Sequence, residues 1–174
     1  MQPFEIVEYR GGRDPEIAAF ILAIQRDDVG VYVAIEDQPE LLDLAHAYGQ
    51  GAFWLAAAGG EIVGTIGMMR FGEIGVLKKL FVRQDHRGRG GVAHALYERA
   101  LAWTMAQHLT AILLDTPAVA TRSHAFYERM GFHRASRTDL PAGYAFPDRD
   151  SLIFKQELCG AVASHACPRV DGTT

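Results

Sequence analysis

The sequence has few cysteines, no long apolar run and no basic leader. Its 174 residues include two cysteines, Cys159 and Cys167, both near the end of the chain. No disulfide framework can therefore span the body of the chain, as is usual for proteins of a reducing compartment. The apolar stretches at 17–24 and 52–58 fall well short of the roughly 20 residues that cross a bilayer. We expect a soluble, unprocessed, cytoplasmic protein with no membrane partner.

The sequence also lacks an excess of positive charge. Lysine and arginine number 17 against 21 aspartate and glutamate, which gives a net charge of −4. Domains that bind nucleic acid through its phosphates usually carry a strong positive excess, so the composition argues against a nucleic-acid partner. Cys159, His165 and Cys167 lack an obvious fourth ligand for a structural zinc site, and no metal is expected.

What the sequence does contain is enough apolar material for one domain. It is 49% hydrophobic and 22% charged, and a chain of this size buries about 70% of the surface that its unfolded form exposes. We expect a single domain over residues 1–158. Residues 159–174 have little periodicity, which is typical of a loosely held tail.

Strand and helix patterns follow one another in an order that predicts a mixed fold. The Gly-Gly and Phe-Gly-Glu connections in the middle of the chain are short enough for hairpins, which predicts an antiparallel meander. A weaker helix is expected after Pro39, with an apolar side of Leu41, Leu42, Leu44 and Ala45. The other expected elements are strands at 4–9, 53–57, 62–69, 74–82, 111–115, 132–135 and 151–158, and helices at 14–24, 92–108 and 121–130.

The most informative segment is a glycine-rich turn within residues 78–93, where a strand runs into a helix. The first N–H groups of a helix have no partner inside the helix, and together with the helix dipole they form an anion site. Arg83, Arg87 and Arg89 add positive charge in a protein that is acidic overall. These features favour a pyrophosphate ligand. The alternative is a turn whose arginines are merely solvated.

The same turn also matches the fingerprint of dinucleotide-binding proteins. Gly88-x-Gly90-x-x-Ala93 fits G-x-G-x-x-G/A, and Asp115 follows at the distance expected of a ribose-binding acid. The context argues against a Rossmann-type NAD-binding oxidoreductase, because the preceding strands form hairpins rather than βαβ units. Residues 83–87 also separate the strand from the first glycine by five polar residues.

Two separated motifs resemble the GNAT superfamily of N-acetyltransferases. Leu80-Phe81-Val82 followed by the turn at 87–93 forms the first motif, and the helical segment 125–132, Ala-Phe-Tyr-Glu-Arg-Met-Gly-Phe, forms the second. The resemblance covers about residues 4–158. It implies an α+β fold of the α/β/α type, in which helices flank a mixed, mostly antiparallel central sheet.

The resemblance also implies a binding site for acetyl-CoA as cosubstrate. The family pattern, Arg/Gln-x-x-Gly-x-Gly/Ala, fits the turn in two registers. With Gly91-x-Ala93 on its last part, Gly88 stands where Arg or Gln is expected; with Arg87-x-x-Gly90 on its first part, Val92 takes the final small position. Implied cofactor-binding residues are Arg87, Gly88, Arg89, Gly90, Gly91, Val92 and Ala93 for the pyrophosphate, Leu80, Phe81 and Val82 for the pantetheine arm and the thioester carbonyl, and Ser123 or Arg122 for a further contact.

Two catalytic roles follow from the resemblance. Tyr127 matches the family tyrosine that protonates the coenzyme A thiolate. Many relatives have a basic glutamate on the strand before the turn, but Val76 occupies that position here, so Glu73 at the start of the strand is a candidate substitute. A water chain to a more distant carboxylate and an already neutral amine are the alternatives. The family asparagine at the start of the tyrosine helix is also missing, and Ala120 stands in its place.

The expected activity is transfer of an acetyl group from acetyl-CoA to a primary amine by direct attack, with no covalent enzyme intermediate. Neither cysteine lies near the expected site, which agrees with this mechanism. The missing glutamate and asparagine leave a second hypothesis, a catalytically weak sensor or module that binds acyl-CoA. The acceptor, a small molecule or a peptide amine, is not identified by any motif. The family contains homodimers, and no sequence feature decides between monomer and dimer.

Overall fold

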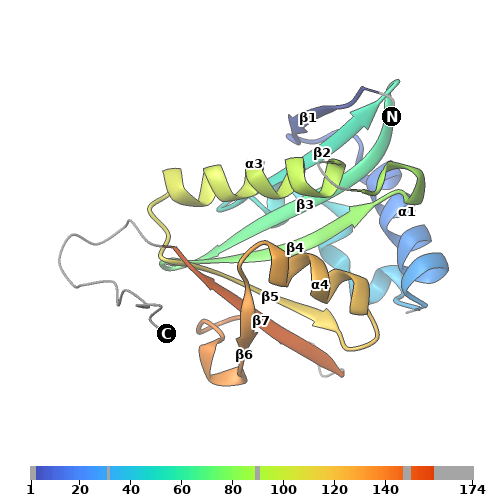
Figure 1. The fold of residues 1–174 in the computed structure, drawn as a ribbon. Helices are drawn as coiled ribbons and strands as arrows, with labels where there is room; N and C mark the ends of the chain where they lie inside the picture. The colour runs from blue at the N-terminus through green and yellow to red at the C-terminus, as the bar shows by residue number, and fades with distance from the viewer. Residues whose placement is uncertain (1–2, 31, 89–90, 147–149, 159–174) are drawn as a thin grey trace, which may run out of the picture.

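The computed structural model describes residues 3–30, 32–88, 91–146 and 150–158 (Figure 1). Within this part of the chain, seven strands form one sheet in the order β1-β2-β3-β4-β5-β7-β6. The strands are β1 (Glu5–Glu8), β2 (Ala52–Ala58), β3 (Glu61–Phe71), β4 (Ile74–Val82), β5 (Ala111–Pro117), β6 (His133–Ala135) and β7 (Ser151–Glu157). The α-helices are α1 (Asp14–Ile24), α2 (Leu44–Ala47), α3 (Val92–Ala106) and α4 (Thr121–Arg129). No helix among the described residues has the length and apolar character needed to cross a membrane.

The sheet is mixed and mostly antiparallel, which confirms the predicted fold class. Strands β1 to β4 form an antiparallel meander, and β5, β7 and β6 pair antiparallel with one another. The two halves meet at the parallel pair β4–β5. This topology excludes the doubly wound sheet that the dinucleotide fingerprint requires. The expected tail at 159–174 lies outside the described residues, so the boundary at 158 stays a prediction.

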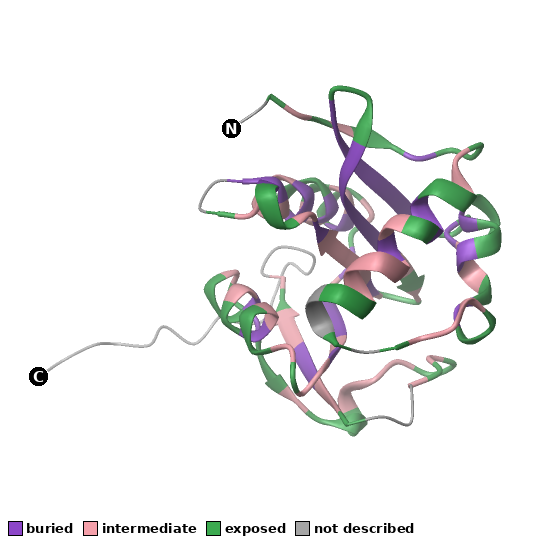
Figure 2. Ribbon diagram, turned by 90° about the vertical axis from the view of Figure 1, so that its right-hand side faces the viewer, coloured by how far each residue is buried: buried purple, intermediate pink, exposed green. Residues whose placement is uncertain are grey.

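Two apolar cores lie on opposite faces of the sheet, as the alternation along β2 requires. Trp54 and Ala56 belong to the core under α3 and α4, whereas Phe53 and Leu55 belong to the core under α1. Figure 1 shows α3 and α4 over one face and α1 behind the other. Buried residues run along the central strands (Figure 2). The resulting α/β/α layering gives each face of the sheet its own helical cover.

The helix expected after Pro39 is only partly present. The chain forms 3₁₀ turns at 35–37 and 39–42, and then the single turn of α2. Asp43 interrupts the pattern because its backbone is not helical and its side chain accepts a hydrogen bond from the His46 amide at 3.0 Å, as an N-cap does. Leu41 and Leu44 are buried as predicted, whereas Leu42 is 67% exposed and Ala45 is exposed as well.

Candidate active site

Strands β4 and β5 separate halfway along their length. Their backbones pair only from Ile74↔Ala111 to Val76↔Leu113, although β4 continues to Val82 and β5 to Pro117. The edge of β4 that faces β5 is therefore not covered by β5 from Lys78 to Val82. Parallel pairing would have used the N–H and C=O groups of this edge. Apart from the Val82 carbonyl, which accepts a hydrogen bond from Arg87, the groups of this edge remain available to a ligand.

A bulge in β4 lies at the same place. Gly67 pairs with Lys78 and Thr65 pairs with Phe81, so two residues of β4 face one residue of β3. Lys79 has a φ of 55°, a conformation that is uncommon for residues other than glycine and that costs of the order of 1–3 kcal/mol. The Thr65 hydroxyl donates to the Lys79 carbonyl at 2.7 Å and holds the bulge. The bulge is followed directly by Leu80, Phe81 and Val82, the residues predicted to contact the pantetheine arm and the thioester carbonyl.

The glycine turn joins the end of β4 to α3. Arg87 donates from Nε to the Val82 carbonyl at 2.8 Å, which ties the turn to the strand. Gly88 has a φ of 144°, where a side chain would be strained, and a Cβ there would meet nothing within 4 Å. Arg89 and Gly90 lie outside the described residues. Among the described residues of the turn, the space beside Gly88 is thus open, as the implied pyrophosphate requires.

The start of α3 fits an anionic ligand. Gly91 is the N-cap and supplies no side-chain hydrogen bond, and the first turn contains no acidic residue. The amides of His94 and Ala95 donate back to Gly91, whereas those of Val92 and Ala93 have no partner within the helix. Val92 is fully buried, whereas Ala93 is half-buried, so of these two residues Ala93 is the one that a ligand can reach. The donor set therefore suits a phosphate.

The positive charge expected at the turn is smaller than the sequence suggests. Arg83 pairs with Glu61 and with Asp85, each at 2.8 Å. Hydrogen bonds from Arg83 and from His86 lower the pKa of Asp85 to about 2. Two carboxylates therefore offset the charge of Arg83, so this residue adds less positive charge at the turn than the sequence pattern favours.

Tyr127 lies on α4 among aromatic side chains. It is 6% exposed, and its ring lies 5.7 Å from those of Phe126 and Phe132 and 6.0 Å from that of Phe154, centroid to centroid. Burial, and to a smaller extent the charge of Asp115, raises the pKa of its hydroxyl. The hydroxyl therefore stays protonated at neutral pH, as a proton donor must.

Ser123 and Glu73, two further residues predicted for the site, lie in different parts of the structure. Ser123 is half-buried in the first turn of α4 and its amide donates to Ala120. Glu73 lies before β4, and its carbonyl accepts a hydrogen bond from the Thr110 amide at 2.8 Å. It is exposed and lies beyond the paired end of β4 and β5. The structure does not bring Glu73 together with the glycine turn or with Tyr127.

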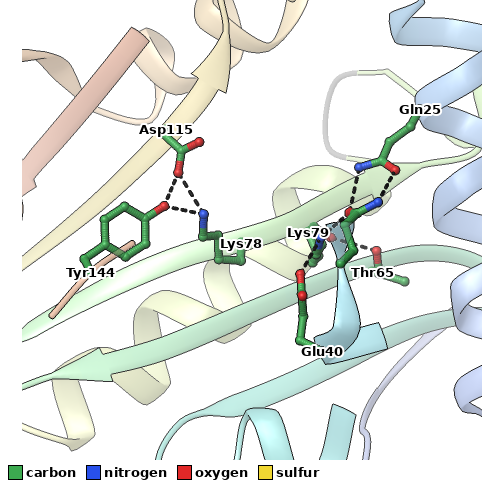
Figure 3. A network of polar contacts seen from close by, with 8 residues as sticks. Gln25, Glu40, Thr65, Lys78, Lys79, Asp115 and Tyr144 are labelled. Carbon is green, nitrogen blue, oxygen red and sulfur yellow. Dashed lines mark hydrogen bonds and ion pairs between the residues drawn. The ribbon is translucent and has the colours of Figure 1, made fainter. Parts of the chain in front are cut away.

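Lys78 and Asp115 meet where β4 and β5 separate (Figure 3). Nζ of Lys78 lies 2.8 Å from Oδ1 of Asp115, and the two side chains are 23% and 9% exposed. The Tyr144 hydroxyl donates to Asp115 and accepts from Lys78. The Tyr144 ring also packs edge-on against Phe71 at 5.6 Å. This cluster ties the segment before residue 147 to both strands.

Lys79 forms a second cluster on the side of α1, visible at the right of Figure 3. Its Nζ lies 2.8 Å from Oε1 of Glu40 and donates to Gln38, whose amide exchanges two hydrogen bonds with Gln25 at 3.0 and 3.1 Å. Burial lowers the pKa of Lys79, although Glu40 opposes the shift. The structure thus places two ammonium groups on consecutive residues of β4.

The sequence analysis missed these clusters. A signal was present, because Lys78 and Lys79 interrupt the apolar run of β4, which is otherwise typical of a buried strand. Asp115 was considered only as the ribose ligand of a dinucleotide site. In the structure its carboxylate instead binds Lys78 and Tyr144.

The comparisons with known proteins agree with this architecture. The model of the acetyltransferase (GNAT) family matches residues 18–132, and the chain belongs to this family. A crystal structure of an acetyltransferase from Streptococcus agalactiae 2603 is 32% identical, has a TM-score of 0.85, and covers 91% of this chain and 100% of its own.

Two curated relatives match over shorter stretches. The probable N-acetyltransferase family 8 member 5 of Mus musculus is 31% identical over 114 residues, which are 61% of this chain and 50% of that protein. The N-acetylaspartate synthetase of Rattus norvegicus is 34% identical over 88 residues, which are 50% of this chain and 29% of that protein. The chain therefore matches half or less of the length of these two relatives.

Proposed function

We propose that the protein is an N-acetyltransferase that transfers an acetyl group from acetyl-CoA to a primary amine by direct attack. The separation of β4 and β5 beyond Val76 and Leu113 carries this proposal. The separation leaves the edge of β4 next to the glycine turn uncovered, and the cofactor binds there. The polar clusters of Lys78 and Lys79 lie on the face of the sheet that α1 covers, and the acceptor approaches β4 from this face.

Backbone groups hold the acetyl-CoA. The amides at the start of α3 that have no partner within the helix bind the pyrophosphate, which lies beside Gly88. The uncovered edge of β4 binds the pantetheine arm. Arg83 donates its N–H to Val63 of β3, so by the alternation of an antiparallel ladder the N–H of Val82 faces the uncovered edge. This N–H polarises the thioester carbonyl, a contribution of about 3 kcal/mol for one donor in comparable acyl transfers.

The transfer requires one proton to leave the amine and another to reach the sulfur. The amine nitrogen forms a bond to the acetyl carbon while the carbon–sulfur bond breaks. Tyr127 gives its hydroxyl proton to the departing thiolate, a role for which its raised pKa keeps it protonated. Asp115 takes the proton of the amine, directly or through water. It provides the more distant carboxylate that replaces the family glutamate.

The alternative, a catalytically weak module that binds acyl-CoA, is favoured by one observation, the buried Val76 at the position of the usual glutamate. Calorimetric titration with acetyl-CoA and a thiol-release assay over a library of amines separate the two. Binding with turnover on at least one amine supports the enzyme. Binding with no turnover on any amine supports the module, and no binding of acetyl-CoA contradicts both.

A further inference from the structure

The ammonium groups of Lys78 and Lys79 are only partly satisfied. An ammonium group has three N–H donors. Lys78 uses two of them on Asp115 and Tyr144, and Lys79 uses two on Gln38 and Glu40. Within the described residues, one donor of each lysine is left for another acceptor. Both side chains are largely buried, with exposed fractions of 23% and 11%.

The hydroxyl of Tyr48 is a third unsatisfied donor in the same region. Tyr48 is 4% exposed, and its hydroxyl has no hydrogen-bond partner among the described residues. A Cβ at Gly67 would lie 2.8 Å from this hydroxyl. Gly67 is the cross-strand partner of Lys78, and directly opposed residues share one face of a sheet. Tyr48 therefore lies beside Lys78 on the face that α1 covers.

Electrostatic effects agree that these groups are neighbours. Burial, and to a smaller extent the charge of Lys78, lowers the pKa of Lys79. Burial, and then the charge of Glu40, raises the pKa of Tyr48. Tyr144 also has its pKa raised, chiefly by burial and Asp115, with a smaller effect from Tyr48. The two lysine clusters and the Tyr48 hydroxyl thus act on one another.

We propose that Lys78, Lys79 and Tyr48 bind a carboxylate of the acceptor, which is therefore an amine of the amino-acid type. Two ammonium donors and one hydroxyl donor suit the oxygens of a carboxylate. A buried hydroxyl without a partner is costly, and a ligand oxygen would remove that cost. The inference rests on the proposed acetyl transfer and specifies its substrate class.

The charge balance favours a zwitterion over a simple anion or a simple cation. Lys78 and Lys79 are offset by Asp115 and Glu40, so the region is neutral before the acceptor binds. A zwitterion keeps it neutral, whereas a singly charged ligand would leave a net charge in a largely buried site. A polyamine would in addition bring positive charge against two lysines, which disfavours that class.

The experiment compares amino acids with their own methyl esters as acceptors. The ester keeps the amine and the side chain but removes the negative charge. Its amine is also less basic, so more of it is neutral at pH 8, which offsets the lower nucleophilicity of that amine, and a large preference for the acid does not come from amine reactivity. We expect kcat/KM to be higher for the acid by about tenfold or more, the effect of one charge-assisted hydrogen bond. Equal or better use of the esters would overturn the inference.

Variants identify the residues that bind the carboxylate. Lys79→Met and Tyr48→Phe should raise KM for the acid and lower the acid-to-ester ratio of kcat/KM, because only the acid carries the negative charge that these residues bind. Tyr48→Phe keeps every charge, so it tests the site even where Lys79→Met fails to fold. Lys155→Met is the matched control, because Lys155 pairs with Asp139 and Glu157 on β7 and should leave the acid-to-ester ratio unchanged.

The outcomes separate the two proposals. Titration with acetyl-CoA accompanies every assay. One contrary result is a wild type that binds acetyl-CoA and uses acid and ester with equal kcat/KM; another is an equal loss of kcat/KM for both acceptors in Lys79→Met and Tyr48→Phe. Either result contradicts the carboxylate site and leaves the proposed acetyl transfer intact. If the wild type binds no acetyl-CoA, the proposed function fails and takes the carboxylate site with it.

Discussion

Lys78 and Asp115 form an ion pair, 2.8 Å from Nζ to Oδ1, two residues beyond the last backbone pair of β4 and β5, Val76↔Leu113. If the parallel ladder continued, these two residues would be register partners. A side-chain contact thus replaces the backbone hydrogen bonds where the strands separate. The pair bridges the two halves of the sheet and leaves the backbone edge of β4 available to a ligand.

This ion pair should contribute to stability. Asp115→Asn leaves the ammonium of Lys78 without its counter-charge, and we expect the free energy of unfolding to fall by about 1–3 kcal/mol, the lower range for a pair that is partly exposed. The double variant Lys78→Met/Asp115→Asn should recover part of this loss. Urea denaturation of the four proteins measures the coupling. Purely additive losses would show that the pair contributes nothing.

Replacing the hydroxyl of Tyr127 should affect the chemical step. Tyr127→Phe should lower kcat about 100-fold or more, the usual contribution of a general acid, and leave the affinity for acetyl-CoA within about twofold, because the ring keeps its aromatic contacts. Tyr97→Phe is the matched control. It removes a buried hydroxyl that donates to Gln156 on the same core and should leave kcat unchanged. Equal kcat for Tyr127→Phe and wild type would remove Tyr127 from its role.

The pH dependence of kcat provides a separate test of Tyr127. Burial raises the pKa of its hydroxyl above the ordinary value, so the protonated form, which is the active form of an acid, persists as the pH rises towards 10. We therefore expect kcat at saturating substrates to show no decrease from this group between pH 7 and pH 10. A basic limb below pH 10 that disappears in Tyr127→Phe would contradict this assignment.

Much of the fold could be predicted from sequence because it depends on local patterns. Alternating and continuous apolar runs located the strands, and the glycines at 59–60 and 72 located the hairpins of the meander. The helix after Pro39 was overestimated because Asp43 offers its own cap to the His46 amide. A short side chain of this kind competes with the helix for backbone donors.

The candidate site could be predicted only where it is local. The glycine turn and the Tyr127 helix are contiguous motifs. The ion pair of Lys78 with Asp115 joins residues 37 positions apart, and Tyr144 contacts Lys78 over a separation of 66. These residues come together because of the register of the parallel pair β4–β5 and the point where its backbone pairing ends. Neither the register nor this end point is encoded in a local sequence pattern.

Arg87 and Arg83 should differ in their effect on cofactor binding. Arg87 donates to the Val82 carbonyl and so positions the turn, whereas Arg83 is neutralised by Glu61 and Asp85. We expect Arg87→Met to raise KM for acetyl-CoA by about tenfold, the effect of about one hydrogen bond, and Arg83→Met to change it by less than about twofold. Steady-state kinetics with both variants measures this. The reverse order would assign the pyrophosphate to Arg83.

Gly64 controls how closely α3 approaches the sheet. A Cβ at this position would lie 2.7 Å from Cγ1 of Val92 and 2.9 Å from Cδ1 of Leu96, closer than packed side chains allow. Gly64→Ala should therefore lower the free energy of unfolding by about 1–3 kcal/mol, as overpacking does. It should also raise KM for acetyl-CoA, because the displaced first turn of α3 holds the amides that bind phosphate.

A second substitution isolates this contact. Val92→Ala removes the closest atom, so Gly64→Ala should cost about 1 kcal/mol less in that background than in the wild type. KM for acetyl-CoA should recover in parallel, because both effects come from one displacement of the helix. Denaturation and kinetics on the four proteins measure the two couplings. If stability recovers while KM does not, the start of α3 does not hold the pyrophosphate, and that part of the cofactor site must be assigned elsewhere.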